Sequence, residues 1–282
     1  YEGTNMLGRS RSARWLPTWN ISGSWNMHEE NFFKPLQPTF SHLTLKASYS
    51  LTADRGPSSI TNSTSIFQAY NPYRPFSSDK ESGIALYQTG NDELTYEKKH
   101  ELNLGIDAGF LNNRINVTFD IYRRNNYDLI GVVTTQGINR EVSSYGNVAS
   151  MKSHGEELSI STTNIKNKDF SWTTNFIYSH AVNEVTDLMS KASTMDYIQG
   201  SGFAKKGYPV RALFSIPFVG LSEDGYPMFI NDKGNVTVGD INFQERENND
   251  YLKYEGPTDP VYTGSLGNIF TYKGFRLNLF IT

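Results

Sequence analysis

Residues 102–125, LNLGIDAGFLNNRINVTFDIYRRN, contain two runs in which apolar and polar side chains alternate. Successive side chains of a β-strand point to opposite faces, so each run predicts a strand with one apolar and one polar face. The segment LNNR at 111–114 joins the runs, and its two asparagines tolerate the positive φ of a tight hairpin turn. The apolar positions are Leu102, Leu104, Ile106, Ala108, Phe110, Ile115, Val117, Phe119 and Ile121.

The apolar face of this predicted hairpin needs a partner, and two kinds are physically sensible. In a soluble β-sandwich the partner is a second sheet. In an outer-membrane barrel the partner is lipid, while the polar face lines a wet lumen. The hairpin alone is compatible with both.

Composition restricts the class of protein. The chain has 282 residues, 37% hydrophobic and 20% charged, which excludes low-complexity disorder as its main state. The sequence contains no run of about 18 apolar residues, so no membrane-spanning helix is predicted. The mean hydropathy of −0.51 is still compatible with a barrel, in which only alternate strand residues face lipid. A net charge of −3 gives no electrostatic reason to expect nucleic acid, and the absence of cysteine excludes disulfides and thiolate metal sites.

The alternation recurs along the chain and predicts about eight strands of roughly ten residues, near the length of a tilted membrane strand. Besides the hairpin, strands are predicted at 19–27, 43–52, around 158–162, 170–178, 264–272 and 275–282. Aromatic residues near the predicted strand ends are typical of an interfacial girdle. These residues are Trp15, Trp19, Phe110, Tyr122, Tyr178, Tyr272 and Phe275.

The connections between the predicted strands alternate in length. Long connections are predicted at 3–14, 53–97, 125–153 and 183–261, and shorter ones at 28–41, 111–114, 164–169 and 273–274. Outer-membrane barrels have short periplasmic turns and long extracellular loops, whereas a Greek-key sandwich has no reason to sort its loops this way. The connections therefore favour the barrel.

Several stretches, in order, resemble SusC/RagA-like TonB-dependent transporters. GNDELTYEKKHELNLGIDAGFLNNRINVTFDIYRRNNYDLI (90–130) is similar to the family's hairpin and to its lead-in "N-x-x-L-x-W/Y-E-K", with Tyr96 where Trp is frequent. The segment 207–235 resembles an extracellular segment with "G-L…G-x-P-x-F…D-x-G-N". Similar stretches also occur at 11–33, 45–54, 145–161 and 259–280.

The resemblance implies an all-β fold: a segment of a large antiparallel transmembrane β-barrel, which has 22 strands in the family, with long extracellular loops and short periplasmic turns. Residues 1–282 would be part of a single TonB-dependent receptor β-barrel domain, with the plug domain and TonB box outside this segment. The expected location is the outer membrane of a Gram-negative, Bacteroidota-like bacterium.

The resemblance also implies active import of glycan oligosaccharides or peptides, with energy supplied through TonB and a SusD/RagB-like surface lipoprotein as a lid. Outer-membrane lipid and lipopolysaccharide are further expected partners, and Arg9, Arg11 and Arg14 are candidates to contact the latter, with a solvated basic loop as the alternative. The alternative function is that of a soluble or surface-exposed β-sandwich that binds glycans.

No catalytic constellation is recognisable in the sequence. The five histidines occur singly, and no G-x-S-x-G, H-E-x-x-H or P-loop spacing is found. We therefore expect no enzyme, no cofactor and no metal site, although a barrel enzyme with a Ser/His pair brought together in space is a further alternative. Asp224–Gly225 and the segment 231–235 are interpreted as turns rather than as calcium ligands.

The ligand-binding candidates lie in FQAYNPYRPF, residues 67–76. Tyr70, Tyr73 and Phe76 offer flat faces on which sugars and peptide side chains stack, and Arg74 offers a fork of donors. The alternative is that these aromatic rings pack the loop onto its neighbours or onto the lid.

Lys46, Asp107 and Asp120 occupy polar positions of the predicted strands. They are candidates to line the lumen of a barrel and the path of a transported molecule. The alternative is that they hold water and one another.

Overall fold

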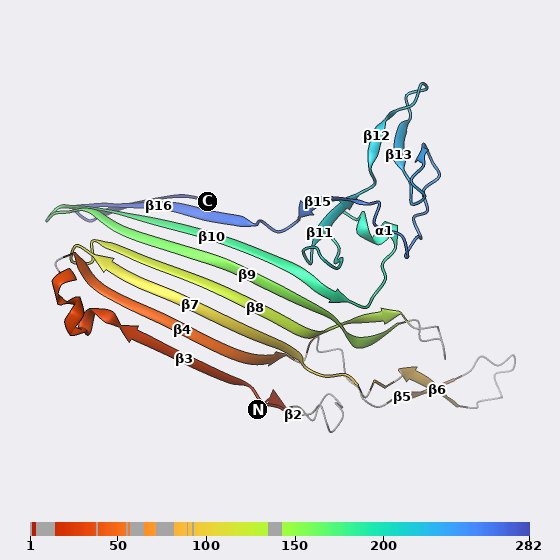
Figure 1. Cartoon of the computed structure of the whole chain (residues 1–282), viewed down its shortest axis with the longest axis horizontal. Coiled ribbons are helices and arrows are strands. Elements are labelled where there is room, and N and C mark those ends of the chain that lie inside the picture. The colour runs from red at the N-terminus through yellow and green to blue at the C-terminus, as the bar shows by residue number, and fades with distance from the viewer. Residues whose placement is uncertain are drawn as a thin grey trace.

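The main element of the computed structural model is one antiparallel sheet of eight strands, in the order β17-β16-β10-β9-β8-β7-β4-β3 (Figure 1). The structure describes residues 2–3, 15–37, 39–54, 56, 65–71, 82–88, 90–91, 93–134 and 143–282. The strands of the main sheet are β3 (Trp19–Asn26), β4 (Phe40–Asp54), β7 (Glu97–Phe110), β8 (Ile115–Thr134), β9 (Ser143–Lys166), β10 (Phe170–Leu188), β16 (Tyr262–Tyr272) and β17 (Phe275–Ile281).

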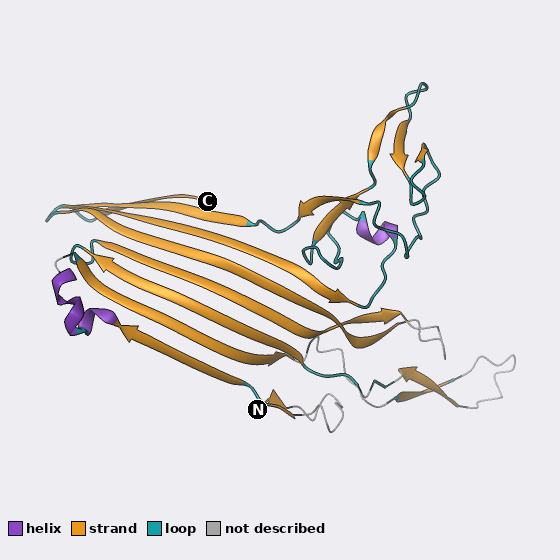
Figure 2. Cartoon of the chain, in the orientation of Figure 1, coloured by secondary structure: helices purple, strands orange, loops and turns teal. Residues whose placement is uncertain are grey.

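Smaller elements lie in the connections (Figure 2). None of the helices in the described part of the chain is long and apolar enough to cross a membrane. The smaller elements are β1 (Glu2–Gly3), β2 (Trp15–Leu16), η1 (Met27–Glu29), η2 (Asn31–Leu36), β5 (Ile66–Tyr70), β6 (Gly83–Gln88), α1 (Thr194–Tyr197), β11 (Ala212–Ser215), β12 (Phe218–Leu221), β13 (Pro227–Ile230), β14 (Val236–Thr237) and β15 (Lys253–Pro257).

The hairpin predicted at 102–125 is confirmed. Strands β7 and β8 pair from Phe110 opposite Ile115 to Lys98 opposite Tyr127. In the turn, Asn112 and Asn113 have φ of 58° and 60°, as the sequence predicts, and Leu111 shares this conformation with φ of 52°.

The eight predicted strands are present, but the predicted length is too short for the middle of the sheet. Strands β8 and β9 remain paired up to Thr134 opposite Ser143. The predicted loop 125–153 is therefore wrong over most of its length. The missed end of β8 reads NNYD at 125–128 and then the apolar run LIGVV at 129–133, which gives no alternation to signal a strand, although backbone pairing continues.

The short and long connections are sorted to opposite ends of the sheet, as predicted (Figure 1). The turns 111–114, 167–169 and 273–274 lie at one end, together with η1 and η2. There Phe33 is 1% exposed and packs against Phe40, with ring centroids 5.7 Å apart. We call this end the turn end and the opposite one the loop end.

At the loop end, the insert at residues 189–261 forms a small folded unit with its own core. The core comprises Ala192, Tyr197, Ala212, Phe214 and Leu252. The insert is joined to the edge of β10 by backbone hydrogen bonds. The N–H of Val185 donates to the carbonyl of Tyr208 (2.9 Å), and the N–H of Gly207 donates to that of Val185 (2.8 Å).

Candidate functional site: the polar face of the sheet

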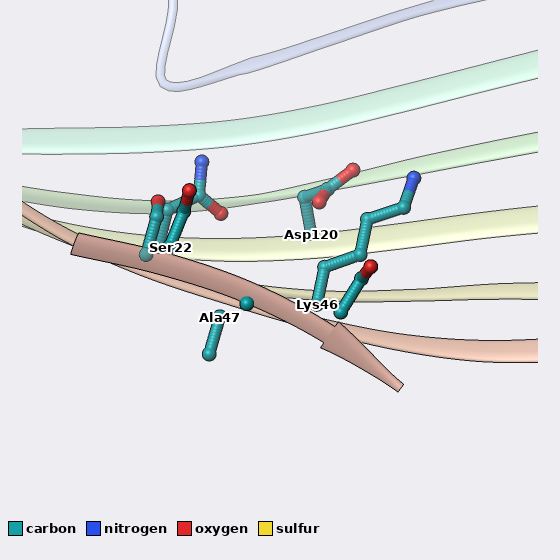
Figure 3. Close-up of a pocket in the computed structure, with 8 residues that line it drawn as sticks. Ser22, Lys46, Ala47 and Asp120 are labelled. Atoms are coloured by element: carbon teal, nitrogen blue, oxygen red, sulfur yellow. The ribbon is translucent and has the colours of Figure 1, made fainter. Parts of the chain in front are cut away.

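The candidate site begins with a row of three residues on adjacent strands. Lys46 on β4 is opposite Gly105 on β7, which is opposite Asp120 on β8. Residues directly opposite one another share a face of the sheet. Figure 3 shows Lys46 and Asp120 projecting to the same side, and Ala47 projecting to the other.

Gly105 provides the room for this arrangement. A Cβ atom at position 105 would lie 2.3 Å from Oδ1 of Asp120 and 3.7 Å from Cβ of Lys46. The carboxylate of Asp120 therefore extends across β7 in space that a larger residue would occupy. An open depression of about 440 Å³ lies beside Lys46 and Asp120 (Figure 3), and Ser22, Ser24, Ser48 and Asn103 also line it.

The charges of this face are not evenly compensated. The ammonium of Lys46 forms an ion pair with Asp107. Asp120 lies directly opposite Glu157 of β9, and within the described part of the chain neither carboxylate has an ion-pair partner. Because like charges opposite each other repel, this part of the face favours a cation in front of it.

A second charged group lies nearer the loop end. Lys99 Nζ is 3.0 Å from Oε2 of Glu101, and Arg124 Nε is 3.1 Å from the same oxygen. The directed hydrogen bond of this pair comes from Nη2 of Arg124, which donates to Oε1 of Glu101 at 3.3 Å. The guanidinium carbon of Arg124 is also 4.1 Å from the ring centre of Tyr122.

The position of Tyr122 shows that its assignment to the predicted aromatic girdle is wrong. It lies opposite Asn103 and Gly155, on the polar face, so it is not part of an outward aromatic girdle. At Gly155, a Cβ atom would be 2.6 Å from the hydroxyl oxygen of Tyr122. Glycine there allows the ring to lie flat across β9.

The opposite face is apolar and uncovered. Leu104, Ile106 and Ile121 lie in the middle of the sheet, yet they are 41%, 42% and 40% exposed. Nothing in the described ranges packs on them as a second layer, and only a single sheet is seen at this position (Figure 1). Exposed apolar surface of this extent marks contact with a membrane or a partner.

The ligand-binding candidates are only partly placed. Tyr70 ends β5, lies opposite Gly83 and is 49% exposed. Tyr73, Arg74 and Phe76 lie outside the described residues, as do Arg9, Arg11 and Arg14.

The two segments interpreted as turns are turns. Oδ1 of Asn231 accepts hydrogen bonds from the N–H groups of Lys233 (3.1 Å) and Asn235 (2.9 Å), and Gly225 has φ of 81°. The described residues contain no cluster of three or more His, Asp or Glu side chains that is suited to a metal ion.

Sequence reasoning did not single out Glu157, Arg124 or the two glycines of the polar face. Their alternation with apolar neighbours was the available signal. Which of them meet is decided by the register between strands.

A sheet with one polar face and one uncovered apolar face, with its turns at one end and its long connections at the other, is the wall of a membrane β-barrel. Residues 2–279 match the family described as TonB dependent receptor-like, beta-barrel. The chain belongs to this family, and the resemblance found in the sequence is confirmed.

Similar curated proteins carry the same designation. The chain is 25% identical to TonB-dependent receptor P3 of Formosa agariphila over 99% of its own length and 29% of the relative. It is 27% identical to TonB-dependent receptor SusC of Bacteroides thetaiotaomicron over 94% of its own length and 27% of that protein. The chain thus spans less than a third of these relatives.

A solved structure has the same fold. The RagAB peptide importer in its closed-closed state aligns with a TM-score of 0.75 and 23% identity, over 96% of this chain and 29% of that one. The all-β barrel fold predicted from the sequence is thereby confirmed, as an open portion of the barrel wall.

Proposed function

We propose that the chain is part of the wall of a SusC/RagA-type TonB-dependent importer in the outer membrane of a Gram-negative bacterium. The supporting observation is the uncovered apolar face of the eight-stranded sheet, with Ile106 42% exposed at its middle. In the intact barrel this face contacts lipid, and further strands pair with the edges β3 and β17, because lipid cannot satisfy backbone hydrogen-bonding groups. A plug domain and a TonB box are assigned to parts of the protein outside residues 1–282.

The same arrangement argues against the β-sandwich. A sandwich buries the apolar face of one sheet against a second sheet about 10 Å away. In the described ranges no such sheet covers Leu104 or Ile121. The family and fold likewise exclude the sandwich.

In the proposed function the polar face lines the lumen. Lys46, Asp107 and Asp120 then contact water, the plug and the passing substrate. Their polar neighbours Ser22, Ser48 and Asn103 support this role because they offer hydrogen bonds without a strong charge. No bond is broken during import, so no catalytic residue or cofactor is required.

We propose oligosaccharides or peptides as the imported nutrients. One similar structure is named a peptide importer, and one relative is named SusC. The loop carrying Tyr70, Tyr73, Arg74 and Phe76 is proposed to contact the substrate at the cell surface. A SusD/RagB-like lipoprotein is proposed as the lid over the loop end.

Native mass spectrometry of the full-length protein, extracted from its own outer membrane in mild detergent, tests this proposal. The expected result is a detergent-dependent species with a co-purifying lipoprotein and a bound sugar or peptide mass. Tyr70→Ala is expected to reduce the bound cargo, whereas the matched change Tyr226→Ala, in an exposed turn of the insert, is not. A species that stays monodisperse without detergent would refute the membrane assignment.

A further inference from the structure

On the outward, apolar face, the loop-end boundary of the apolar band carries two basic residues without partners. Arg123 of β8 lies directly opposite His154 of β9, and both side chains are exposed. Leu102 is the neighbour of Arg123 on β7, and Ile121 is the next outward residue toward the turn end. A guanidinium thus borders an apolar surface that, in the proposed function, contacts lipid.

The acidic groups near this pair have other basic neighbours. The closest outward carboxylate along β9 is Glu156, whose Oε1 is 3.4 Å from Nδ1 of His180. One step toward the loop end, Glu184 is 2.9 Å from the ammonium of Lys152. Among the described residues, neither Arg123 nor His154 takes part in an ion pair.

Aromatic residues and histidines on both sides are typical of a boundary between apolar and aqueous surroundings at this level. The hydroxyl of Tyr49 is 3.0 Å from Nδ1 of His100, whose ring is 5.8 Å from that of Tyr127. On the other side, the rings of His180 and Tyr262 stack at 4.6 Å. Amphipathic rings of this kind gather where hydrocarbon gives way to headgroups.

We propose that Arg123 and His154 bind a phosphate group of lipopolysaccharide in the outer leaflet. This inference rests on the proposed function, which puts the loop end at the cell surface. Guanidinium groups pair bidentately with phosphate, and an imidazole opposite supplies a further donor. The lipid's acyl chains would then lie along Leu102 and Ile121, which are 40% exposed in each case.

The test uses the full-length protein in mild detergent, titrated with monophosphoryl lipid A and with the same glycolipid after dephosphorylation, and bound lipid is counted by native mass spectrometry. The double variant Arg123→Gln/His154→Gln is expected to weaken binding of the phosphorylated lipid about ten-fold or more, as the loss of a charge-assisted contact implies. Arg123→Lys retains part of the preference, because it keeps the charge and loses the fork.

Arg276→Gln is the matched control, because Arg276 is an exposed arginine on the polar face of β17. It is expected to bind like the wild type. Equal binding by the wild type and the double variant, or no preference for the phosphorylated lipid, would overturn the site while leaving the barrel assignment intact. A wild-type protein that does not fractionate with outer membranes would instead contradict the proposed function, and the site with it.

Discussion

Lysine substitutions at three positions of β7 measure where the apolar face lies in the bilayer. Ile106→Lys places a charge on the outward face between the turn at Leu111 and the loop end. From position 106 to 111 the strand runs roughly 17 Å at about 3.4 Å per residue, and a tilt of about 40° makes this about 13 Å along the membrane normal. This is the middle of an apolar band about 25 Å tall.

The expected cost follows from that depth. A lysine at the midplane destabilises a barrel by about 2–4 kcal/mol, whereas one near the interface costs about 0–1 kcal/mol. Leu102 lies about 23 Å from the turn by the same calculation, so Leu102→Lys should cost about 1 kcal/mol or less. Asn103→Lys is the control, because Asn103 is adjacent in sequence but on the polar face.

The assay is guanidinium unfolding of the full-length protein folded into phospholipid vesicles, followed by tryptophan fluorescence. The free energy of unfolding should fall in the order Asn103→Lys, Leu102→Lys, Ile106→Lys, with Ile106→Lys the least stable. If Ile106 were exposed to water, its replacement would change stability by about 0.5 kcal/mol or less. Equal stabilities of Ile106→Lys and Asn103→Lys would therefore refute the assignment of this face to lipid.

Three further predictions concern single contacts. Gly105→Ala should lower the free energy of unfolding by about 1 kcal/mol and displace the carboxylate of Asp120, because the new Cβ would lie 2.3 Å from its Oδ1. Gly23→Ala is the control and should be neutral or stabilising, because nothing lies within 4 Å of the new Cβ. Paired unfolding titrations test this, and equal effects of the two changes would contradict the close contact. Asn147→Ala should increase hydrogen exchange at residues 93–96 and lower the stability of this segment by about 1–2 kcal/mol. The reason is that Asn147 accepts from the N–H of Thr95 (2.8 Å) and donates to its carbonyl (3.1 Å). Unchanged protection would show that burial alone holds the segment. The hydroxyl and N–H of Ser193 donate to the Asp196 carboxylate and lower its pKa below the usual 3.8. The ionised carboxylate therefore stabilises α1 at neutral pH, and this contribution is lost as the pH falls through the lowered pKa. Asp196→Asn should abolish that acid dependence in hydrogen exchange of residues 194–198, and an unaltered pH profile would contradict the capping role.

The sequence predicts strands well where a strand has two different environments. Alternation is clear in β7 and in the first part of β8, because one side faces polar surroundings and the other an apolar one. From Arg123 to Asp128 polar residues occupy both sides of β8, so the period disappears while pairing with β9 continues. The predicted strands therefore end where the two faces stop differing in polarity, although the backbone pairing continues.

The candidate site shows a similar division. The alternation of side chains within each strand is enough to place Lys46, Asp107 and Asp120 on the polar face. Alternation cannot predict which carboxylate pairs with Lys46, because that depends on the register between strands. Lys46 lies opposite Gly105, and its ammonium turns to Asp107 instead of crossing β7 to Asp120.

The motif at 91–96 has a physical reason that the sequence alone does not reveal. Leu94 and Tyr96 are each 2% exposed, and Nδ2 of Asn91 donates to the carbonyl of Tyr145 at 2.9 Å. The lead-in to β7 is therefore fixed against β9, a strand two positions away in the sheet.

The long strands at the loop end provide a rigid mount for the insert. Beyond His180 the edge of β10 is no longer paired with β16, and the insert takes over that edge through Val261, Tyr208 and Gly207. The Oδ1 of Asn183 also accepts from the N–H of Val210 at 2.8 Å. Because these contacts are largely backbone hydrogen bonds along one strand, the insert is held in a defined direction relative to the wall. In the proposed importer, any rearrangement of the insert must therefore either carry the end of β10 with it or break this pairing.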